Sequence, residues 1–243
     1  MDVRDKVVIV TGASSGIGLA TAWLFAERGA RLALVARSRD RLEMLARELQ
    51  GSVAIPADMT KTDEIAEMVA ETKKHFGRSD VLVNNAGQGY DASIEQIDVE
   101  TFHHIFELDV VGPLVAMQRV IPGLRRAGGG AIVNVSSGLA LMAVPGMSPY
   151  SAAKRALVGL SLTAREDLKE DGIVVSVVYP YATLTDFEAN TIKAIEEEEP
   201  EADGGGRFPP DTADYVAQKI LEAIETGEAE AFAHDWMKNL GPR

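Results

Sequence analysis

Cysteine is absent from all 243 positions of the sequence. Its absence excludes disulfide frameworks, thiol nucleophiles and cysteine metal sites, and it fits a reducing compartment. Basic residues are also few, because 24 lysines and arginines stand against 37 aspartates and glutamates, which gives a formal net charge of −13. Nucleic acids and anionic membranes attract clustered positive charge. We therefore expect no nucleic-acid partner and no membrane partner.

Long apolar runs are missing too. A membrane-spanning helix needs about 20 consecutive apolar residues, and no stretch of the sequence approaches that length. The stretch MDVRDKVVIVTGASSGIG lacks the charged start, long apolar stretch and cleavage site of a signal peptide. These absences predict a soluble, cytoplasmic protein. The four histidines show no metal-ligand spacing, so no metal site is expected; they are His75, His103, His104 and His234.

The composition is that of a globular α/β protein, with 46% hydrophobic and 25% charged residues. The length suits one domain over residues 1–243. Short runs rich in Val, Ile, Leu and Ala alternate with longer segments of helical period, which is typical of βα units and a parallel sheet. The expected strands are 6–10, 31–36, 52–56, 81–84, 131–136, 173–179 and a short last strand at 229–233. The expected helices are 17–28, 39–50, 63–76, 99–126, 150–170 and 212–225.

One long irregular segment, at about 184–210, combines acidic residues, glycine and proline. A loop of this length in a compact domain is usually functional or disordered. A substrate lid is the usual functional form. Both interpretations stay open, and the acidic run within the segment is expected to be solvated.

A glycine-rich turn follows the first expected strand in VVIVTGASSGIG, with Gly12, Gly16 and Gly18. Glycine lets the backbone approach a ligand closely, and the helix that follows offers free N–H groups and a positive dipole to a pyrophosphate. The position between strand and helix favours a dinucleotide site, and the alternative is a tight turn without a ligand.

At Thr11 to Gly18 the sequence matches the pattern TGxxxGxG, and here it resembles the short-chain dehydrogenase/reductase family. The family's NNAG and adenine-contacting motifs follow at residues 84–87 and 57–60. The resemblance spans nearly the whole chain and implies a Rossmann-like, doubly wound parallel sheet with helices on both faces, and a nicotinamide cofactor. The cofactor contacts that it implies in these motifs are Gly12, Ser14, Ser15, Gly16, Ile17, Gly18, Asp58, Met59, Asn85, Ala86 and Gly87.

The second expected strand ends in ALVARSRDR, which bears on the choice of cofactor. An acidic residue there binds the ribose 2′-hydroxyl of NAD, whereas an arginine attracts the 2′-phosphate of NADP. Ala36 stands where NAD-preferring relatives carry Asp. We expect NADP(H), with Arg37 as the main phosphate ligand and Ser38 as a donor, and NAD(H) is less favoured. The alternative is a basic helix start on the surface.

The reacting centre implied by the resemblance is Ser137, Tyr150 and Lys154, in which Tyr150 follows Ser137 by thirteen positions and Lys154 follows Tyr150 by four. A free tyrosine has a pKa of about 10, so roughly one in a thousand is ionised at neutral pH. An ammonium ~4 Å away is worth roughly 4 kcal/mol at an effective dielectric of 20, or about three pKa units. Tyr150 could then act as the general acid/base of carbonyl reduction and alcohol oxidation. Without the other motifs, the Tyr and Lys could be unrelated neighbours on a helix.

After the sixth strand the family usually reads PGxxxT, and this chain reads PYATLT. The implied cofactor contacts are Pro180, Thr183 and Thr185, with Thr185 on the nicotinamide carboxamide. Tyr181 replaces the family's glycine. We expect its ring to enter the nicotinamide or substrate side of the cleft.

A second departure is Asp109, at the position of the family's catalytic asparagine in the segment FELDVVGPL. Its backbone carbonyl could still hold a relay water. Its side chain, if ionised, would partly cancel the field of Lys154 and raise the pKa of Tyr150. Asp109 and Tyr181 together keep a second hypothesis open, an NADP(H)-binding sensor or regulatory protein with weak or no turnover.

The resemblance also indicates which segments line the substrate cleft, with ordinary loop packing as the alternative. Their apolar character favours an apolar carbonyl or alcohol as the small-molecule substrate. The segment residues are Gln88, Tyr90, Leu139, Met142, Val144 and Met147. By resemblance, the expected helix 99–126 and the tyrosine-bearing helix form a homodimer or homotetramer face.

Overall fold

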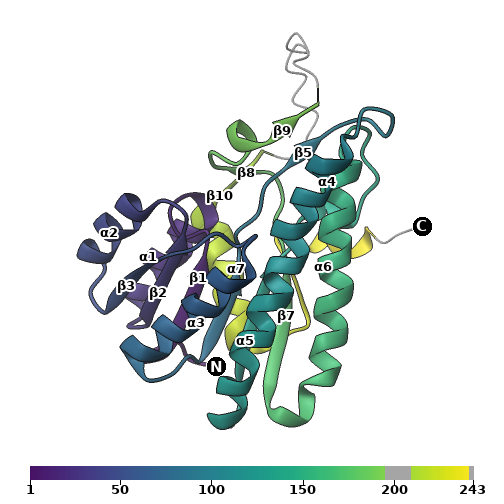
Figure 1. Cartoon of the computed structure of the whole chain (residues 1–243). Coiled ribbons are helices and arrows are strands. Elements are labelled where there is room, and N and C mark those ends of the chain that lie inside the picture. Colours follow the sequence, from purple (N-terminus) through teal and green to yellow (C-terminus); the bar gives the residue numbers. More distant parts are fainter. Residues whose placement is uncertain (195–208, 241–243) are drawn as a thin grey trace.

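A computed structural model describes residues 1–194 and 209–240. Its centre is a parallel sheet of seven strands in the order β11-β7-β6-β4-β1-β2-β3 (Figure 1). The strands are β1 (Val7–Thr11), β2 (Arg31–Ala36), β3 (Ser52–Pro56), β4 (Val81–Asn84), β6 (Gly130–Val135), β7 (Ile173–Tyr179) and β11 (Glu230–Phe232). Each of the seven predicted strands is present within a residue or two of its predicted bounds.

Neighbouring residues of a strand point to opposite faces of the sheet, so apolar strands make both faces apolar. Helices cover both of these faces. In β1, Val8 and Val10 join one apolar core and Ile9 joins the other. The first core includes residues of α1 (Gly16–Glu27), α2 (Arg39–Glu48) and α7 (Ala213–Thr226). The second includes residues of α3 (Thr62–Phe76), α5 (Gly112–Arg126) and, at its edge, α6 (Ser148–Asp167). The predicted doubly wound parallel fold is therefore confirmed.

The predicted helix 99–126 is interrupted. It consists of α4 (Val99–Phe106), a π-helical turn over Glu107–Val111, and α5. Pro113 has no N–H to give to the carbonyl of Asp109 four residues earlier, so the regular α-helical ladder cannot continue there. The π-helical turn takes up this break, and Asp109 lies inside it.

Part of the predicted irregular segment is regular. The short strand β8 (Thr183–Leu184) pairs with β10 (Asp211–Thr212), and β9 (Ile192–Lys193) pairs with β5 (Tyr90–Asp91). Figure 1 shows these pairs beyond one edge of the central sheet. The rest of the predicted lid, residues 195–208, lies outside the described residues.

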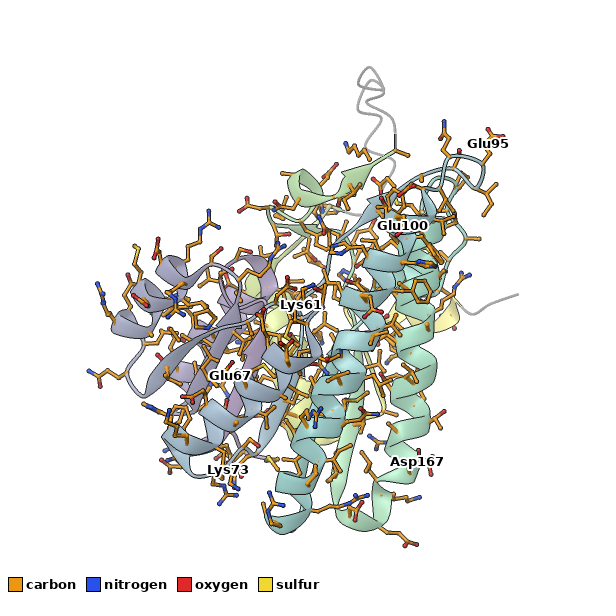
Figure 2. All side chains as sticks on the ribbon, in the orientation of Figure 1. Lys61, Glu67, Lys73, Glu95, Glu100 and Asp167 are labelled. Carbon is orange, nitrogen blue, oxygen red and sulfur yellow. The ribbon has the colours of Figure 1, made fainter. Side chains whose placement is uncertain are left out.

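Charged side chains mark the outer surface of the molecule. Figure 2 shows Lys73, Glu95 and Asp167 projecting outward, and all three are exposed. Within the described residues, no helix combines the length and the apolar character that a membrane crossing requires.

Candidate active site

The hydroxyl of Thr11, at the end of β1, joins the two central strands of the sheet. It accepts hydrogen bonds from the backbone N–H groups of Asn85 (2.9 Å) and Ala86 (3.0 Å), and it donates to the carbonyl of Val83 (3.3 Å). The side-chain amide of Asn85 donates back to the carbonyl of Thr11 at 2.9 Å. The TG and NNAG motifs are therefore one hydrogen-bonded unit at the carboxyl edge of the sheet.

Asn84 extends this unit toward the helix that carries the tyrosine. Its amide donates to Asn134 of β6 at 2.8 Å, and the amide of Asn134 donates to the hydroxyl of Ser161 in α6 at 2.8 Å. All three residues are buried. A chain of side-chain hydrogen bonds thus fixes α6 relative to the dinucleotide turn.

The glycine turn is shaped by close backbone approach. Gly12 and Gly16 have positive φ angles of 68° and 51°. A Cβ on Gly18 would lie 2.2 Å from the carbonyl oxygen of Gly12. Ser15 precedes α1 without a capping side-chain hydrogen bond, and the first turn of α1 carries no acidic residue. The first N–H groups of α1 remain available to an anion such as a pyrophosphate.

The adenine end of the predicted site lies beside β2 and β3. Burial by itself would raise the pKa of Asp58, but hydrogen bonds from Thr60 and the charge of Arg37 hold that pKa below its usual value. Thr60 donates to Asp58 through its backbone N–H (2.9 Å) and its hydroxyl (2.8 Å). Arg37 and Ser38 are exposed at the end of β2, and Met59 is buried.

Ser137, Tyr150 and Lys154 come together where β6 ends and α6 begins. Tyr150 and Lys154 are 8% and 3% exposed, and the Nζ of Lys154 lies 5.5 Å from the centre of the Tyr150 ring. The same Nζ donates to the carbonyl of Val135 at 3.2 Å. Ser137 is half-buried, whereas the hydroxyl of Ser136 donates to the backbone carbonyl of Lys154 at 3.3 Å and so ties α6 to β6.

Asp109 enters this group from the π-helical turn. Its Oδ2 lies 3.1 Å from the Nζ of Lys154, and its Oδ1 accepts a hydrogen bond from the backbone N–H of Gln88 at 3.1 Å. A Cβ on Gly87 would lie 3.1 and 3.2 Å from the two carboxylate oxygens and 3.2 Å from the Nζ. The glycine of the NNAG motif therefore leaves the space in which the ion pair forms.

The pKa values of this group are coupled. Burial raises the pKa of Tyr150 and the carboxylate of Asp109 raises it further, while Lys154 and Ser137 oppose the shift without cancelling it. Burial by itself would lower the pKa of Lys154, but Asp109 and Tyr150 raise it above its usual value. Burial also raises the pKa of Asp109, against the charge of Lys154 and the Gln88 N–H. The effect of Asp109 on Tyr150 has the direction predicted from the sequence.

Phe187 is a site residue that sequence reasoning missed. Its ring centre lies 5.6 Å from that of Tyr150, and 38% of the residue is exposed. The hydroxyl of Thr185 accepts from the N–H of Phe187 (3.2 Å), and the hydroxyl of Thr191 donates to its carbonyl (3.0 Å). The only sequence signal was one aromatic residue in a polar stretch, which has no periodicity to mark it.

Two residues predicted near the cleft, Tyr90 and Tyr181, have partners that the sequence did not reveal. Tyr90 is 1% exposed and its phenolic oxygen accepts from the N–H of Asp98, so it is a core residue. The ring of Tyr181 packs edge-on against Trp236 (5.5 Å) and His234 (5.9 Å) of the C-terminal segment, and its entry into the cleft stays a prediction.

The other predicted residues around the cleft have definite places. Gln88 donates through its side chain to the carbonyl of Asn190 at 2.9 Å, joining the loop after β4 to the segment 184–193. Thr185 lies over the glycine turn, since a Cβ on Gly16 would be 3.1 Å from its methyl group. Pro180 is buried after β7, and Thr183 begins β8. The loop between β6 and α6 carries Leu139, Met142, Val144 and Met147.

A parallel sheet with a glycine turn at its carboxyl edge, beside a buried tyrosine and lysine, defines the class of dinucleotide-dependent oxidoreductases. Comparison with known proteins identifies the family. Residues 6–196 match the family model described as short chain dehydrogenase. The chain belongs to the short chain dehydrogenase family and is an oxidoreductase that acts on CH–OH groups with a nicotinamide cofactor.

Individual relatives agree with this assignment. The chain is 34% identical over 243 residues to "11-beta-hydroxysteroid dehydrogenase-like 2" of Arabidopsis thaliana, an alignment that covers 98% of this chain and 76% of the relative. A solved short-chain dehydrogenase from Streptomyces avermitilis is 30% identical, with a TM-score of 0.87 and coverage of 99% and 92%. A 7α-hydroxysteroid dehydrogenase, solved with NADH and 7-oxo glycochenodeoxycholic acid, is 25% identical, with a TM-score of 0.86 and coverage of 95% and 93%.

The turn geometry leads to a first prediction. Gly18→Ala should lower the affinity for a nicotinamide nucleotide at least about tenfold and destabilise the fold by about 1–3 kcal/mol, because the new methyl group overlaps the Gly12 carbonyl. Nucleotide titration and thermal unfolding measure the two effects. The control is Gly159→Ala in α6, where a Cβ would meet nothing within 4 Å. That change should keep the affinity and stabilise the helix by roughly 0.5–1 kcal/mol; equal behaviour of the two variants would contradict the close-approach argument.

Proposed function

We propose that this chain is an NADP(H)-dependent oxidoreductase that interconverts a ketone or aldehyde with its alcohol, with Tyr150 as the general acid/base. The observation that supports this most is that Tyr150 and Lys154 are buried together at the carboxyl edge of the sheet, beside the dinucleotide turn. Perturbed ionisable groups at such an edge are typical of catalytic sites. By the family resemblance, α4, α5 and α6 are the proposed faces of a homodimer or homotetramer.

The residues present fit a dinucleotide. The glycine turn provides a cradle that side chains would fill, and the uncapped start of α1 suits the pyrophosphate. Asp58 and Met59 would hold the adenine; Lys154 would hold the nicotinamide ribose and Thr185 the carboxamide. When bound, the nicotinamide supplies or accepts the hydride.

Side chains of the protein transfer the proton and stabilise the charges that the transfer creates. In reduction, the phenol of Tyr150 gives its proton to the carbonyl oxygen; in oxidation, the phenolate takes the proton of the alcohol. Ser137 orients the substrate oxygen and stabilises charge that develops on it. The ammonium of Lys154 stabilises the phenolate that reduction leaves behind.

The preference for NADP(H) rests on the end of β2. Ala36 offers no carboxylate to repel a 2′-phosphate, and Arg37 and Ser38 are exposed beside it. Arg39 is engaged with Glu43 at 3.7 Å on the surface of α2. A guanidinium in the position of Arg37 suits a phosphate well, because its donors form a planar fork.

An apolar substrate is favoured by Phe187. An exposed aromatic side chain directly beside a proposed proton donor offers an apolar wall to a bound molecule. The two steroid dehydrogenase relatives, by name or by bound ligand, are also associated with large apolar molecules.

A second candidate function is a nucleotide-binding sensor with little turnover. The observation in its favour is the ion pair of Asp109 with Lys154, which weakens the positive field at Tyr150. The next experiment distinguishes the two functions.

Tyr150→Phe should lower carbonyl reduction by about 10²- to 10⁴-fold, the usual contribution of a general acid, while NADPH binding is kept. A panel of ketones and aldehydes with NADPH measures turnover, and fluorescence titration measures binding. Tyr215→Phe, which loses the hydrogen bond from its hydroxyl to the carbonyl of Ala233 but lies away from Lys154, is the matched control. Turnover that survives in Tyr150→Phe would refute the mechanism. Tight NADPH binding without turnover of any substrate by the wild type would favour the sensor.

Arg37→Ala should raise the Kd for NADPH by about 10- to 100-fold and leave the Kd for NADH nearly unchanged, because the side chain contacts the 2′-phosphate alone. Calorimetric titration with both nucleotides measures this. Arg39→Ala, which removes an arginine two positions away, should change neither constant. An equal effect of Arg37→Ala on both nucleotides would refute the phosphate assignment.

Phe187→Ala should raise the KM for bulky apolar ketones by about tenfold and leave the KM for acetone almost unchanged, because an apolar wall worth about 1.5–3 kcal/mol is removed. Steady-state kinetics with paired large and small ketones measures the difference. Leu184→Ala is the control, since Leu184 is 66% exposed in the same segment but pairs with β10. An equal change in the KM for large and small ketones would show that Phe187 does not select the substrate.

A further inference from the structure

The pair of Asp109 and Lys154 differs from the other ion pairs in the described part of the chain, because both of its side chains are buried. The side chain of Lys154 is 4% exposed and that of Asp109 is 0% exposed. An ion pair at a surface contributes little, whereas a buried charge that loses its partner is costly. The carboxylate of Asp109 therefore acts on the charge of Lys154 and, together with it, on Tyr150.

Three features build the place of this carboxylate. The π-helical turn before Pro113 carries Asp109, Gly87 leaves room for it, and the N–H of Gln88 donates to it. These features come from separate parts of the chain. Separate segments of the chain therefore hold the carboxylate of Asp109 in the site.

The groups that act on the phenol come from three parts of the chain. Lys154 acts on Tyr150 from its own helix, Asp109 acts from the π-helical turn, and Ser137 acts from the end of β6. His104, in α4, acts in turn on Asp109. With a carboxylate oxygen 3.1 Å from the ammonium, Tyr150 experiences a nearly neutral pair where a lone lysine would present a full positive charge.

We propose that Asp109 is a positioning residue that keeps Tyr150 in its proton-donating form, so that carbonyl reduction persists into alkaline solution and alcohol oxidation begins only there. The part that concerns turnover rests on the proposed function. The pKa of Tyr150 is raised first by its burial and then by the carboxylate of Asp109, which acts in the proposed direction.

The balance of the reaction limits what Asp109 can do. Reduction adds a hydride to the carbonyl carbon and the phenolic proton to its oxygen, and the phenolate then regains a proton from solvent. Oxidation runs the same steps backward. The equilibrium between ketone and alcohol is untouched, and Asp109 sets the pH at which each form of Tyr150 is populated.

The sign of the effect follows from the forms of the phenol. Reduction needs the phenol, so its rate falls as pH rises through the pKa of Tyr150. Oxidation needs the phenolate, so its rate rises through the same pKa. A raised pKa moves both transitions to higher pH, and removal of the carboxylate moves both to lower pH.

The test is a titration of the phenol itself, followed by the absorbance of the phenolate. The signal of Tyr150 is the difference between each protein and its Tyr150→Phe version. In Asp109→Asn, half-ionisation should fall by about one pH unit or more relative to the wild type, as expected when a nearby charge is removed. Asp98→Asn is the control, because Asp98 caps α4 from the surface and asparagine caps equally well; it should leave the titration unchanged.

The outcomes separate this inference from the proposed function. An unchanged titration in Asp109→Asn, or a wild-type Tyr150 that ionises below the ordinary value of about 10, overturns the inference. The second criterion needs the wild type and Tyr150→Phe alone, so it holds even if Asp109→Asn does not fold. A shifted titration without turnover of any substrate supports the role of Asp109 and rejects the oxidoreductase proposal. With turnover, the pH profiles of reduction and oxidation should move with the titration.

Discussion

The carboxyl edge of the sheet depends on one hydroxyl group, that of Thr11. It accepts hydrogen bonds from two backbone N–H groups that follow β4 and donates to one carbonyl of β4; Thr11 itself is buried, where an unmet polar group is expensive. This arrangement lets β4 leave the sheet and turn outward beside the glycine turn. Asn84 and Asn134 then carry the same network to α6, so that the dinucleotide turn and the tyrosine are positioned by one set of bonds.

A polar network of this kind also explains how a charged pair is tolerated nearby. Lys154 has a carbonyl, that of Val135, and a carboxylate, that of Asp109, as partners. Gly87 belongs to the motif that Thr11 holds, and its missing side chain leaves space for the pair. The dinucleotide site and the proton donor therefore share a boundary at the NNAG motif, and a change in that motif acts on both.

The sequence predicted most of the fold because strands buried on both faces leave continuous apolar runs, as in β1 and β7. Through resemblance to the family's motifs it also indicated that Ser137, Tyr150, Lys154 and Asp109 lie in one site. What it missed depended on three-dimensional packing. Before Pro113 the predicted helix contains a π-helical turn and does not end, because helix continues on both sides of the turn. Tyr181 turned to aromatic residues more than fifty positions away, and Phe187 reached Tyr150 from a segment without a periodic pattern.

The two-residue pairing of β9 with β5 has a consequence for how the molecule assembles. It joins Tyr90 to Ile192, and beside it the side chain of Gln88 donates to the carbonyl of Asn190, so that both contacts span about a hundred residues of chain. Contacts between such distant segments form late in folding, because the intervening chain must first be ordered. So small a pairing adds little stability of its own. The segment that brings Phe187 to Tyr150 is therefore attached to the loop after β4 through few bonds, each of which closes a loop of about a hundred residues.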